Sequence, residues 1–526
     1  MNHSADIAKA RTGTPAAAAA PRPSVNGHRG LAHEEALLFE RDNPGAVGVD
    51  LPPPPAVAAR LGGVARRAPV GLPSLSEPEV VRHYTRLSRQ NAAIDTNTYP
   101  LGSCTMKHNP RLNERLARLP GLAGLHPLQP ESTVQGALAL IDELARWLCE
   151  LTGMPAVAMS PGAGAHGELC GMMTIRAALD ARGETARRRV LVPESAHGTN
   201  PATAAMCGFA IDPVPDDGSG RVDLAAFVAK LGPDVAAVMI TNPNTCGLYE
   251  CDIAELGRKV HAAGGYLYCD GANFNAIVGR VRPGDLGIDC MHLNLHKTFS
   301  TPHGGGGPGA GPVVLSAALA DFAPLPWIVA DGDGLRLVEH AGDAAARERH
   351  PIGRLKGFHG QMGMFVRALA YMLSHGIDGL RQVSGDAVLA ANYVRAALQD
   401  RMSVAFPGTC MHECLFDDRF LAGTGVTTLD FAKAMIDEGV HPMTMYFPLV
   451  VHGAFLVEPT ETESKASLDE LIAVMADLAD AAKAGDRDRF AEAPRLAPRR
   501  RLDETTAARR PVLRWTPPAD TAQAAE

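Results

Sequence analysis

Lys297 and Asp270 are the two residues of this chain whose surroundings most clearly suggest chemistry. Lys297 follows the alternating apolar and polar residues Cys290–Leu295, which predict a strand, and a glycine cluster, Gly304–Gly307, comes soon after it. Asp270 ends the apolar run Gly265–Cys269, which predicts the preceding strand. Because α/β proteins bind ligands at the carboxyl ends of their strands, the two side chains could grip opposite sides of one aromatic ring. Pyridoxal phosphate needs such a pair: an amine at its aldehyde and a carboxylate at its pyridinium nitrogen.

Either residue alone could simply belong to an ordinary turn at the end of a strand. A pyridoxal phosphate site therefore also requires a place for the phosphate. The glycine-containing turn Ser160–Glu168 is a candidate. It lies between the apolar run Ala156–Met159, which predicts a buried strand, and residues Leu169–Leu179, whose apolar side chains recur at helical spacing. Free N–H groups and the positive end of the helix dipole suit a phosphate there. We expect it to bind the backbone of three residues, Ala163, Gly164 and Ala165.

The same turn supports a rival hypothesis. Gly162–Gly167 formally fits the dinucleotide fingerprint, and the strand predicted next along the chain is followed by Glu194. An oxidoreductase that binds NAD is therefore a serious alternative. Such an enzyme would have no use for Asp270 and Lys297, and the turn lies in mid-chain after a long predicted helix. Both hypotheses place a phosphate at the start of a helix beginning near Glu168, and only the cofactor differs.

Two more loops follow predicted strands. His197, in the loop Glu194–Pro201, could lie flat against an aromatic cofactor ring or could cap the next helix. After the predicted strand Val235–Ile240, the loop Thr241–Gly247 contains Asn244, whose amide could bond a ring hydroxyl or form an Asx turn. The residues themselves leave both choices open.

With four such loops in place, the sequence resembles subunit 2 of the bacterial glycine dehydrogenase (decarboxylating), the catalytic half of the glycine cleavage system P-protein. The resemblance runs in order from about residue 40 towards the C-terminus, whereas Met1 to about Gly30 departs from the family pattern. The segments that carry it are Asp95–Lys107, Gly162–Glu168, His197–Thr203, Asp270–Asn275, His292–Phe299, His303–Gly309, Tyr446–His452 and Glu458–Ser464.

This resemblance implies a specific reaction. Lys297 would hold pyridoxal phosphate covalently, and Asp270 would keep the ring nitrogen protonated, so that the ring accepts the electrons left when glycine loses CO2. The aminomethyl group would pass to the lipoyl disulfide of the H-protein, which makes the enzyme a glycine dehydrogenase (aminomethyl-transferring). The expected catalytic residues are Lys297, His197 and Asp270, and the other expected cofactor-binding residues are Ala163, Gly164, Ala165, Asn244, Ala272 and His296. No metal is expected.

The resemblance also implies the fold: an α/β protein of the pyridoxal phosphate-dependent transferase type (fold type I), with a mostly parallel sheet in a large domain and a smaller C-terminal α/β domain. Strands predicted near residues 156, 189, 208, 235, 265, 290 and 312 alternate with helices, as in a parallel sheet covered on both faces. Apolar spacing predicts a core-facing helix over Ser132–Thr152 that opens with a capping box of Ser132 and Gln135. A further helical stretch is expected over Glu77–Ala93, and short strands over Met411–Phe416 and Ala454–Glu458.

We expect five segments along the chain: a disordered arm (1–30), an extension (31–95), the cofactor-binding domain (96–360), the small domain (361–488) and a C-terminal strap (489–526). The arm is rich in alanine, proline and arginine and poor in acids, so a transit peptide is an alternative for it. Mitochondrial P-proteins are single fused chains, whereas the resemblance is to the two-subunit form. A bacterial cytoplasmic location is therefore expected.

Composition agrees with this assignment. With 526 residues, 46% of them apolar, the chain can bury large cores and should hold at least two domains. The net charge of −8 argues against nucleic acid as a partner, and no apolar run is long enough to span a membrane. Ten cysteines without a CxxC pair indicate reduced thiols rather than disulfides or a zinc site.

A non-catalytic interaction subunit is the third class considered. Subunit 1 of the same system resembles this fold but lacks the cofactor lysine, and Lys297 therefore places this chain on the catalytic side. The resemblance implies that subunit 1 is a partner in an α2β2 heterotetramer, besides glycine and the lipoylated H-protein. It leaves open whether His296 or His303 donates a proton or only shapes the phosphate loop.

Overall fold

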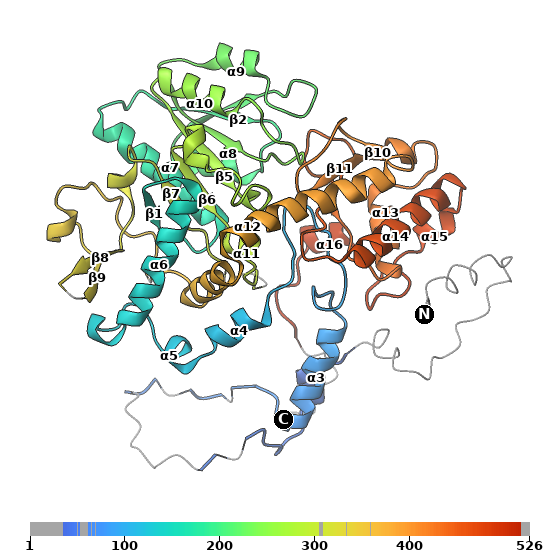
Figure 1. The fold of residues 1–526 in the computed structure, drawn as a ribbon. Coiled ribbons are helices and arrows are strands. Elements are labelled where there is room, and N and C mark those ends of the chain that lie inside the picture. The colour runs from blue at the N-terminus through green and yellow to red at the C-terminus, as the bar shows by residue number, and fades with distance from the viewer. Residues whose placement is uncertain are drawn as a thin grey trace. The chain divides into compact units, whose positions relative to one another are not determined.

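The computed structural model describes residues 35–49, 51–52, 62–64, 66–68, 70–304, 309–332, 334–357 and 359–516 (Figure 1). The predicted arm and residues 305–307 of the glycine cluster lie outside these ranges. The chain divides into two compact units, one formed by Ala93–Glu492 and the other by Met1–Ala92 together with Ala493–Glu526. The five segments expected from the sequence stay a prediction.

The unit Ala93–Glu492 is built on a seven-stranded sheet with the order β1-β7-β6-β5-β4-β2-β3. The five strands from β6 to β3 are parallel, whereas β7 pairs antiparallel with both β6 and β1. The predicted mostly parallel sheet is thereby confirmed. The strands are β1 (Ala156–Ala158), β2 (Arg189–Pro193), β3 (Ala210–Val214), β4 (Val235–Thr241), β5 (Tyr266–Gly271), β6 (Cys290–Leu293) and β7 (Val313–Leu315).

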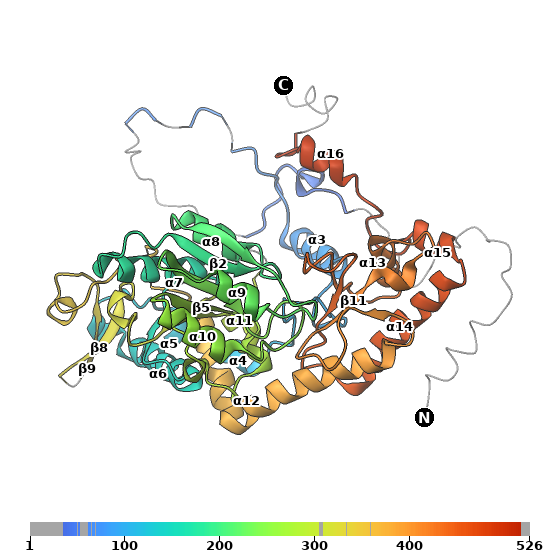
Figure 2. The same ribbon diagram turned by 90° about the horizontal axis from the view of Figure 1, so that it is seen from above.

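Helices cover both faces of this sheet (Figure 2). Every residue of β4 and β5 is buried, which explains why these strands are almost continuously apolar. One face packs against α7 (Gly164–Ala181) and α8 (Thr199–Met206), and the other against α6 (Gln135–Thr152), α10 (Ile253–Ala262) and the first part of α12 (Met362–Leu398). The short helix α9 (Leu224–Lys230) connects β3 to β4.

Helix α6 ends at Thr152 as expected but begins at Gln135, and the predicted capping box is wrong. Glu131–Thr133 form a separate 3-10 turn, and the residue before the helix, Val134, has no capping side chain. The Gln135 amide nitrogen instead donates to the carbonyl oxygens of Glu131 (2.9 Å) and Leu335 (2.7 Å). Its oxygen accepts the Leu335 N–H. Gln135 thus holds β9 (Gly334–Val338), which forms a hairpin with β8 (Trp327–Asp331).

The C-terminal part of this unit follows the long helix α12, in which Gly376 departs from helical geometry (φ 60°, ψ −177°). It contains a smaller antiparallel sheet of order β10-β11-β13-β12. Its elements are β10 (Ser403–Val404), β11 (Cys414–Asp417), α13 (Thr428–Asp437), β12 (Thr444–Met445), β13 (Phe455–Val457), α14 (Lys465–Lys483) and α15 (Arg487–Ala491). The expected smaller C-terminal α/β portion is present, and β11 and β13 fall within or next to the predicted strands.

The second unit contains the helices α3 (Glu77–Arg89) and α16 (Glu504–Arg509). Helix α3 is shorter than the predicted stretch to Ala93, because its last turn closes at Gln90. It begins with a capping box in which the Ser76 N–H donates to Glu79. No helix among the described residues is long and apolar enough to cross a membrane.

Candidate active site

Asp270 lies at the carboxyl end of β5, beside His292 on the neighbouring parallel strand β6. Asp270 as a whole is only 3% exposed. Its Oδ1 accepts the Ala272 N–H (2.9 Å) and lies 3.3 Å from Nε2 of His292. When the Asn200 amide nitrogen faces the carboxylates, it donates to Asp270 Oδ2 at 3.2 Å. The Ala272 N–H and the Asn200 amide therefore fix this carboxylate at the sheet edge, with the His292 ring beside it.

A second buried carboxyl group, Glu168, lies next to Asp270. The amide of Asn200 also donates to Glu168 Oε2 (2.9 Å), and the Thr199 hydroxyl donates to Oε1 (2.8 Å). Burial and the charge of Asp270 together raise the pKa of Glu168 to about 8. Glu168 therefore keeps its proton at pH 7, and the pair avoids a second buried negative charge. Sequence reasoning did not assign a role to Glu168 or Asn200, although both lie in the segments that carry the family resemblance.

The glycine-containing turn leads directly into the N-terminus of α7. The helix begins at Gly164 rather than near Glu168, because Ala163 already caps it and its carbonyl oxygen accepts the Gly167 N–H (2.9 Å). The expected phosphate contacts of Gly164 and Ala165 use backbone N–H groups of the first helical turn. These N–H groups have no partner within the helix. A phosphate would therefore meet free donors and the positive end of the helix dipole.

The turn is also narrow, which limits the anion it can hold. A side chain on Gly164 would press against the Asn294 amide, and one on Gly311 would collide with the carbonyl of Ala163. Two residues after β1, the Ser160 hydroxyl is buried and has no hydrogen-bond partner among the described residues. An orphaned hydroxyl beside a helix N-terminus fits a compact phosphate group.

Lys297 lies in α11 (Leu295–Thr298), the short helix that follows β6. Its amine donates to the carbonyl oxygen of Ser103 at 2.7 Å. The neighbouring carbonyl, of Cys104, is bonded to His303 Nε2 (2.9 Å). The segment around Ser103, which the sequence analysis quoted only for its resemblance, therefore adjoins the lysine.

Three histidines lie on and after β6: the side-chain amide of Asn294 connects His292 to His296, and the ring of His303 meets that of His296 edge-on. His292 lies 2.6 Å from the Tyr268 hydroxyl and 2.9 Å from Oδ1 of Asn294, whose nitrogen is 3.1 Å from His296. Burial and the charges of the nearby His303 and Lys297 together lower the pKa of His296 to about 3. Burial likewise lowers the pKa of His303. Both rings are therefore neutral at pH 7 and suit hydrogen bonding rather than charge pairing.

His197 makes the contacts of a capping residue but also offers a ring. Its Nδ1 lies 2.8 Å from the Thr199 hydroxyl and accepts the Thr199 N–H at 3.3 Å, at the start of α8. The ring meets Phe447 edge-on, with the ring centroids 5.6 Å apart. The side chain is otherwise exposed, and stacking on a cofactor ring stays a prediction.

Asn244 does not fit the cofactor-binding role expected for it. Its amide nitrogen donates to the Gly220 carbonyl (2.8 Å) and to Glu250 (2.7 Å). Its oxygen accepts the N–H groups of Cys246 (3.0 Å) and Leu248 (3.1 Å). These four bonds use the full capacity of the amide. Asn244 therefore shapes its loop, and we leave it out of the proposed site.

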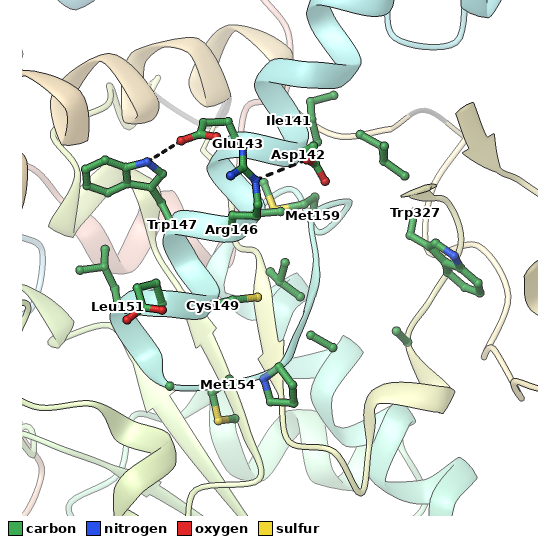
Figure 3. A pocket seen from close by; sticks show the side chains of 18 of the residues that line it. Ile141, Asp142, Glu143, Arg146, Trp147, Cys149, Leu151, Met154, Met159 and Trp327 are labelled. Carbon is green, nitrogen blue, oxygen red and sulfur yellow. Dashed lines mark hydrogen bonds and ion pairs between the residues drawn. The ribbon is translucent and has the colours of Figure 1, made fainter. Parts of the chain in front are cut away.

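A cavity of about 1310 Å³ lies along α6, and none of the nine predicted site residues lines it. Figure 3 shows Trp147, whose indole N–H donates to Glu143 (2.9 Å), and Arg146, which pairs with Asp142 (3.5 Å). The size of this cavity is therefore no guide to where the proposed chemistry takes place.

Comparison with known proteins agrees with this geometry. Residues 171–307 match the class-V aminotransferase family, and residues 383–496 match the C-terminal domain of glycine dehydrogenase. A Caulobacter vibrioides protein named "Probable glycine dehydrogenase (decarboxylating) subunit 2" is 66% identical over 522 residues, which are 98% of this chain and 99% of the relative. The chain belongs to this family.

Another family member of the same name, from Desulforamulus reducens, is 49% identical over 92% of this chain and 99% of its own length. Among solved structures, the inhibitor-bound glycine decarboxylase (P-protein) of the glycine cleavage system aligns with a TM-score of 0.67. It is 21% identical, and the alignment covers 80% of this chain and 94% of that one. This likeness supports the fold type I architecture.

Proposed function

We propose that this member of the glycine dehydrogenase (decarboxylating) subunit 2 family decarboxylates glycine and transfers the aminomethyl group to the lipoyl arm of an H-protein. The observation that carries the proposal is the meeting of three groups at one sheet edge. These are the amine of Lys297 after β6, the buried carboxylate of Asp270 at the carboxyl end of β5 and the helix N-terminus at Gly164. The high identity to the family over nearly the whole chain supports it.

The cofactor we propose is pyridoxal phosphate. Lys297 would bond its aldehyde carbon, Asp270 would face its ring nitrogen, and the turn Ala163–Ala165 would hold its phosphate. When bound, this cofactor supplies a ring that accepts electrons from the bond being broken. The Asp270 carboxyl group would face the ring nitrogen, and the Ala272 N–H and the Asn200 amide keep it oriented. The protonated Glu168 holds Asn200 in place without adding charge.

The partners and location follow from the family. The relatives are named as subunit 2, which supports a subunit 1 as partner, and we propose an α2β2 heterotetramer that takes up glycine and docks a lipoylated H-protein. A bacterial cytoplasmic location is part of the same proposal.

Titration of the protein stripped of cofactor tests the proposal against the dinucleotide alternative. Pyridoxal phosphate is expected to restore glycine-dependent CO2 release in the presence of subunit 1 and H-protein, whereas NAD is expected not to bind. The reason is that the turn at Gly164, closed by Asn294 and by Gly311, admits a compact anion. Saturable NAD binding that Gly164→Val abolishes would establish the oxidoreductase instead.

Replacing His197 with alanine is expected to weaken retention of pyridoxal phosphate without preventing its attachment. Stacking of two rings contributes about 0.5–1.5 kcal/mol beyond burial, which corresponds to a Kd about 2–10 times higher. An absorbance titration of the stripped protein measures this Kd. His452→Ala is the matched control, because His452 is exposed and its ring pairs with Asp418. An unchanged Kd in the His197 variant would leave His197 as a helix cap only.

A further inference from the structure

Three fully buried ionisable side chains, His412, Glu413 and Glu458, form a cluster that the proposed reaction does not use. His412 and Glu413 directly precede β11, and Glu458 directly follows β13, the strand paired with it. The His412 Nε2 atom lies 3.9 Å from Glu413 Oε2 and 3.8 Å from Glu458 Oε1. Neither ring nitrogen of His412 has a hydrogen-bond partner among the described residues.

One loop connects this cluster to Lys297. Ser103 donates its N–H to Glu413 Oε2 (2.7 Å), and its carbonyl oxygen accepts the Lys297 amine (2.7 Å). Two residues later, Thr105 donates its N–H (2.8 Å) and its hydroxyl (2.6 Å) to Glu458. Ser103 and Thr105 both have positive φ angles, 61° and 52°, which non-glycine residues adopt only when their surroundings impose them. The loop is thus held in a strained form in which one residue, Ser103, bonds both the lysine and Glu413, and the next but one, Thr105, bonds Glu458.

The charges in this cluster are not balanced by arginine or by another lysine. Within the part of the chain that the structure describes, neither Glu413 nor Glu458 has a lysine or arginine nitrogen within 4.0 Å. Burial raises the pKa of both glutamates, and the charge of Glu458 raises that of Glu413 further. Burial lowers the pKa of His412 to about 3, so the imidazole is neutral. Two buried negative charges side by side would therefore be very costly.

We propose that Glu413 and Glu458 together carry one proton while Lys297 is an ammonium ion, and take up a second proton when the lysine charge is removed. In its singly protonated, negatively charged form, the pair is the counter-ion of the positively charged free lysine. The exchange is a proton transfer only: a carboxylic acid and an amine become a carboxylate and an ammonium ion, and the reverse restores them. The proposal rests on Lys297 being the lysine that bonds the cofactor, since only then does its charge change during turnover.

A metal ion held by the same three side chains is the competing explanation. The structure favours protons, because the carboxylate oxygens already accept three N–H or O–H donors from Ser103 and Thr105. The Lys297 amine, which lowers the pKa of both glutamates by its charge, would also repel a cation placed between them.

Infrared difference spectroscopy tests the proposal, because an undissociated carboxylic acid has its own carbonyl stretching band. Other ionisable groups influenced by Lys297 are Cys104, His197, His292, His296, His303 and Glu168. Of these only Glu168 is an acid that would contribute such a band. The measurements are therefore made on cofactor-free protein with Glu168→Gln as the common background.

At pH 7, the spectrum of the background protein minus that of its Glu413→Gln derivative is expected to show the acid band. Adding Lys297→Met to the background is expected to increase this band, as a second proton enters the pair. Glu458→Gln, judged by circular dichroism to be folded, serves as the second variant and is expected to remove the Lys297-dependent increase. No acid band at pH 7, a band unchanged by Lys297→Met, or stoichiometric metal in the purified protein would overturn the proposal. Loss of glycine turnover alone would not produce any of these results, so failure of the proposed function remains distinguishable.

Discussion

Replacement of Lys297 by alanine is expected to abolish both the visible absorbance of bound pyridoxal phosphate and the release of CO2 from glycine. The amine is the group that bonds the cofactor, and alanine removes it without disturbing the carboxyl edge of the sheet, since Lys297 lies in a short helix after β6. An arginine at this position would retain the charge but cannot form the bond. The expected fold is unchanged, as circular dichroism and thermal unfolding would show.

Reduction with borohydride followed by peptide mapping identifies the lysine directly. The label is expected on the peptide that contains Lys297. Lys107 is also buried nearby, but it is held by Glu461 (2.5 Å) and by the carbonyl of Thr298 (3.0 Å), so it is not expected to react. Lys465→Ala, a change of an exposed lysine on α14, is the control and should behave as the unmodified protein. A label on any lysine other than Lys297 would refute the assignment.

Replacement of Asp270 by asparagine is expected to cause the second large loss. An amide cannot hold the proton of a pyridinium nitrogen, so the ring would accept electrons poorly. Breaking one side of a buried ion pair costs about 3–5 kcal/mol, which corresponds to a fall in kcat of about 10²–10⁴-fold. Steady-state kinetics with glycine measure this, and the loss should fall mainly on kcat because the proposed role of Asp270 is to make the ring accept electrons.

Asp289 offers a matched control for this experiment. It is buried like Asp270 and bonds a histidine, His261 (2.7 Å), but it precedes β6 and so lies at the opposite edge of the sheet. It also accepts the Leu267 N–H (2.8 Å). Asp289→Asn should therefore lower the free energy of unfolding and leave kcat near normal. Near-normal turnover in the Asp270 variant would mean that this carboxylate does not face the ring.

Local patterns allowed the sheet to be predicted from the sequence. The buried strands β4 and β5 are short apolar runs, and Asp270 at the end of β5 was recognisable because a polar residue ends such a run. Helix α7 begins earlier than its expected start near Glu168, because the apolar periodicity that indicates the helix begins only at Leu169. The glycines and alanines before it are helical but contribute nothing to that pattern.

The remaining features depend on contacts between residues that are far apart in the chain. Gln135 has the spacing of a capping residue, but a strand some 200 positions later takes its amide. The position of Asn244 after a strand suggests a contact with a ligand, whereas its bonds are decided by the turn it closes. The link from Lys297 through Ser103 to Glu413 joins three distant segments. No local pattern carries such information, because each residue type is unremarkable where it stands.

The antiparallel strand β7 has a consequence for how new variants of this enzyme could be built. Between parallel strands the chain must return to the opposite edge of the sheet through a crossover connection. Strands β6 and β7 run in opposite directions instead, and the Leu293 N–H donates to the Pro312 carbonyl (2.8 Å). The chain that carries Lys297 thus leaves and re-enters the sheet at the same edge. The segment between β6 and β7 is therefore an insert whose two ends are held by neighbouring strands. It could be exchanged for the corresponding segment of another family member without changing the crossover helices.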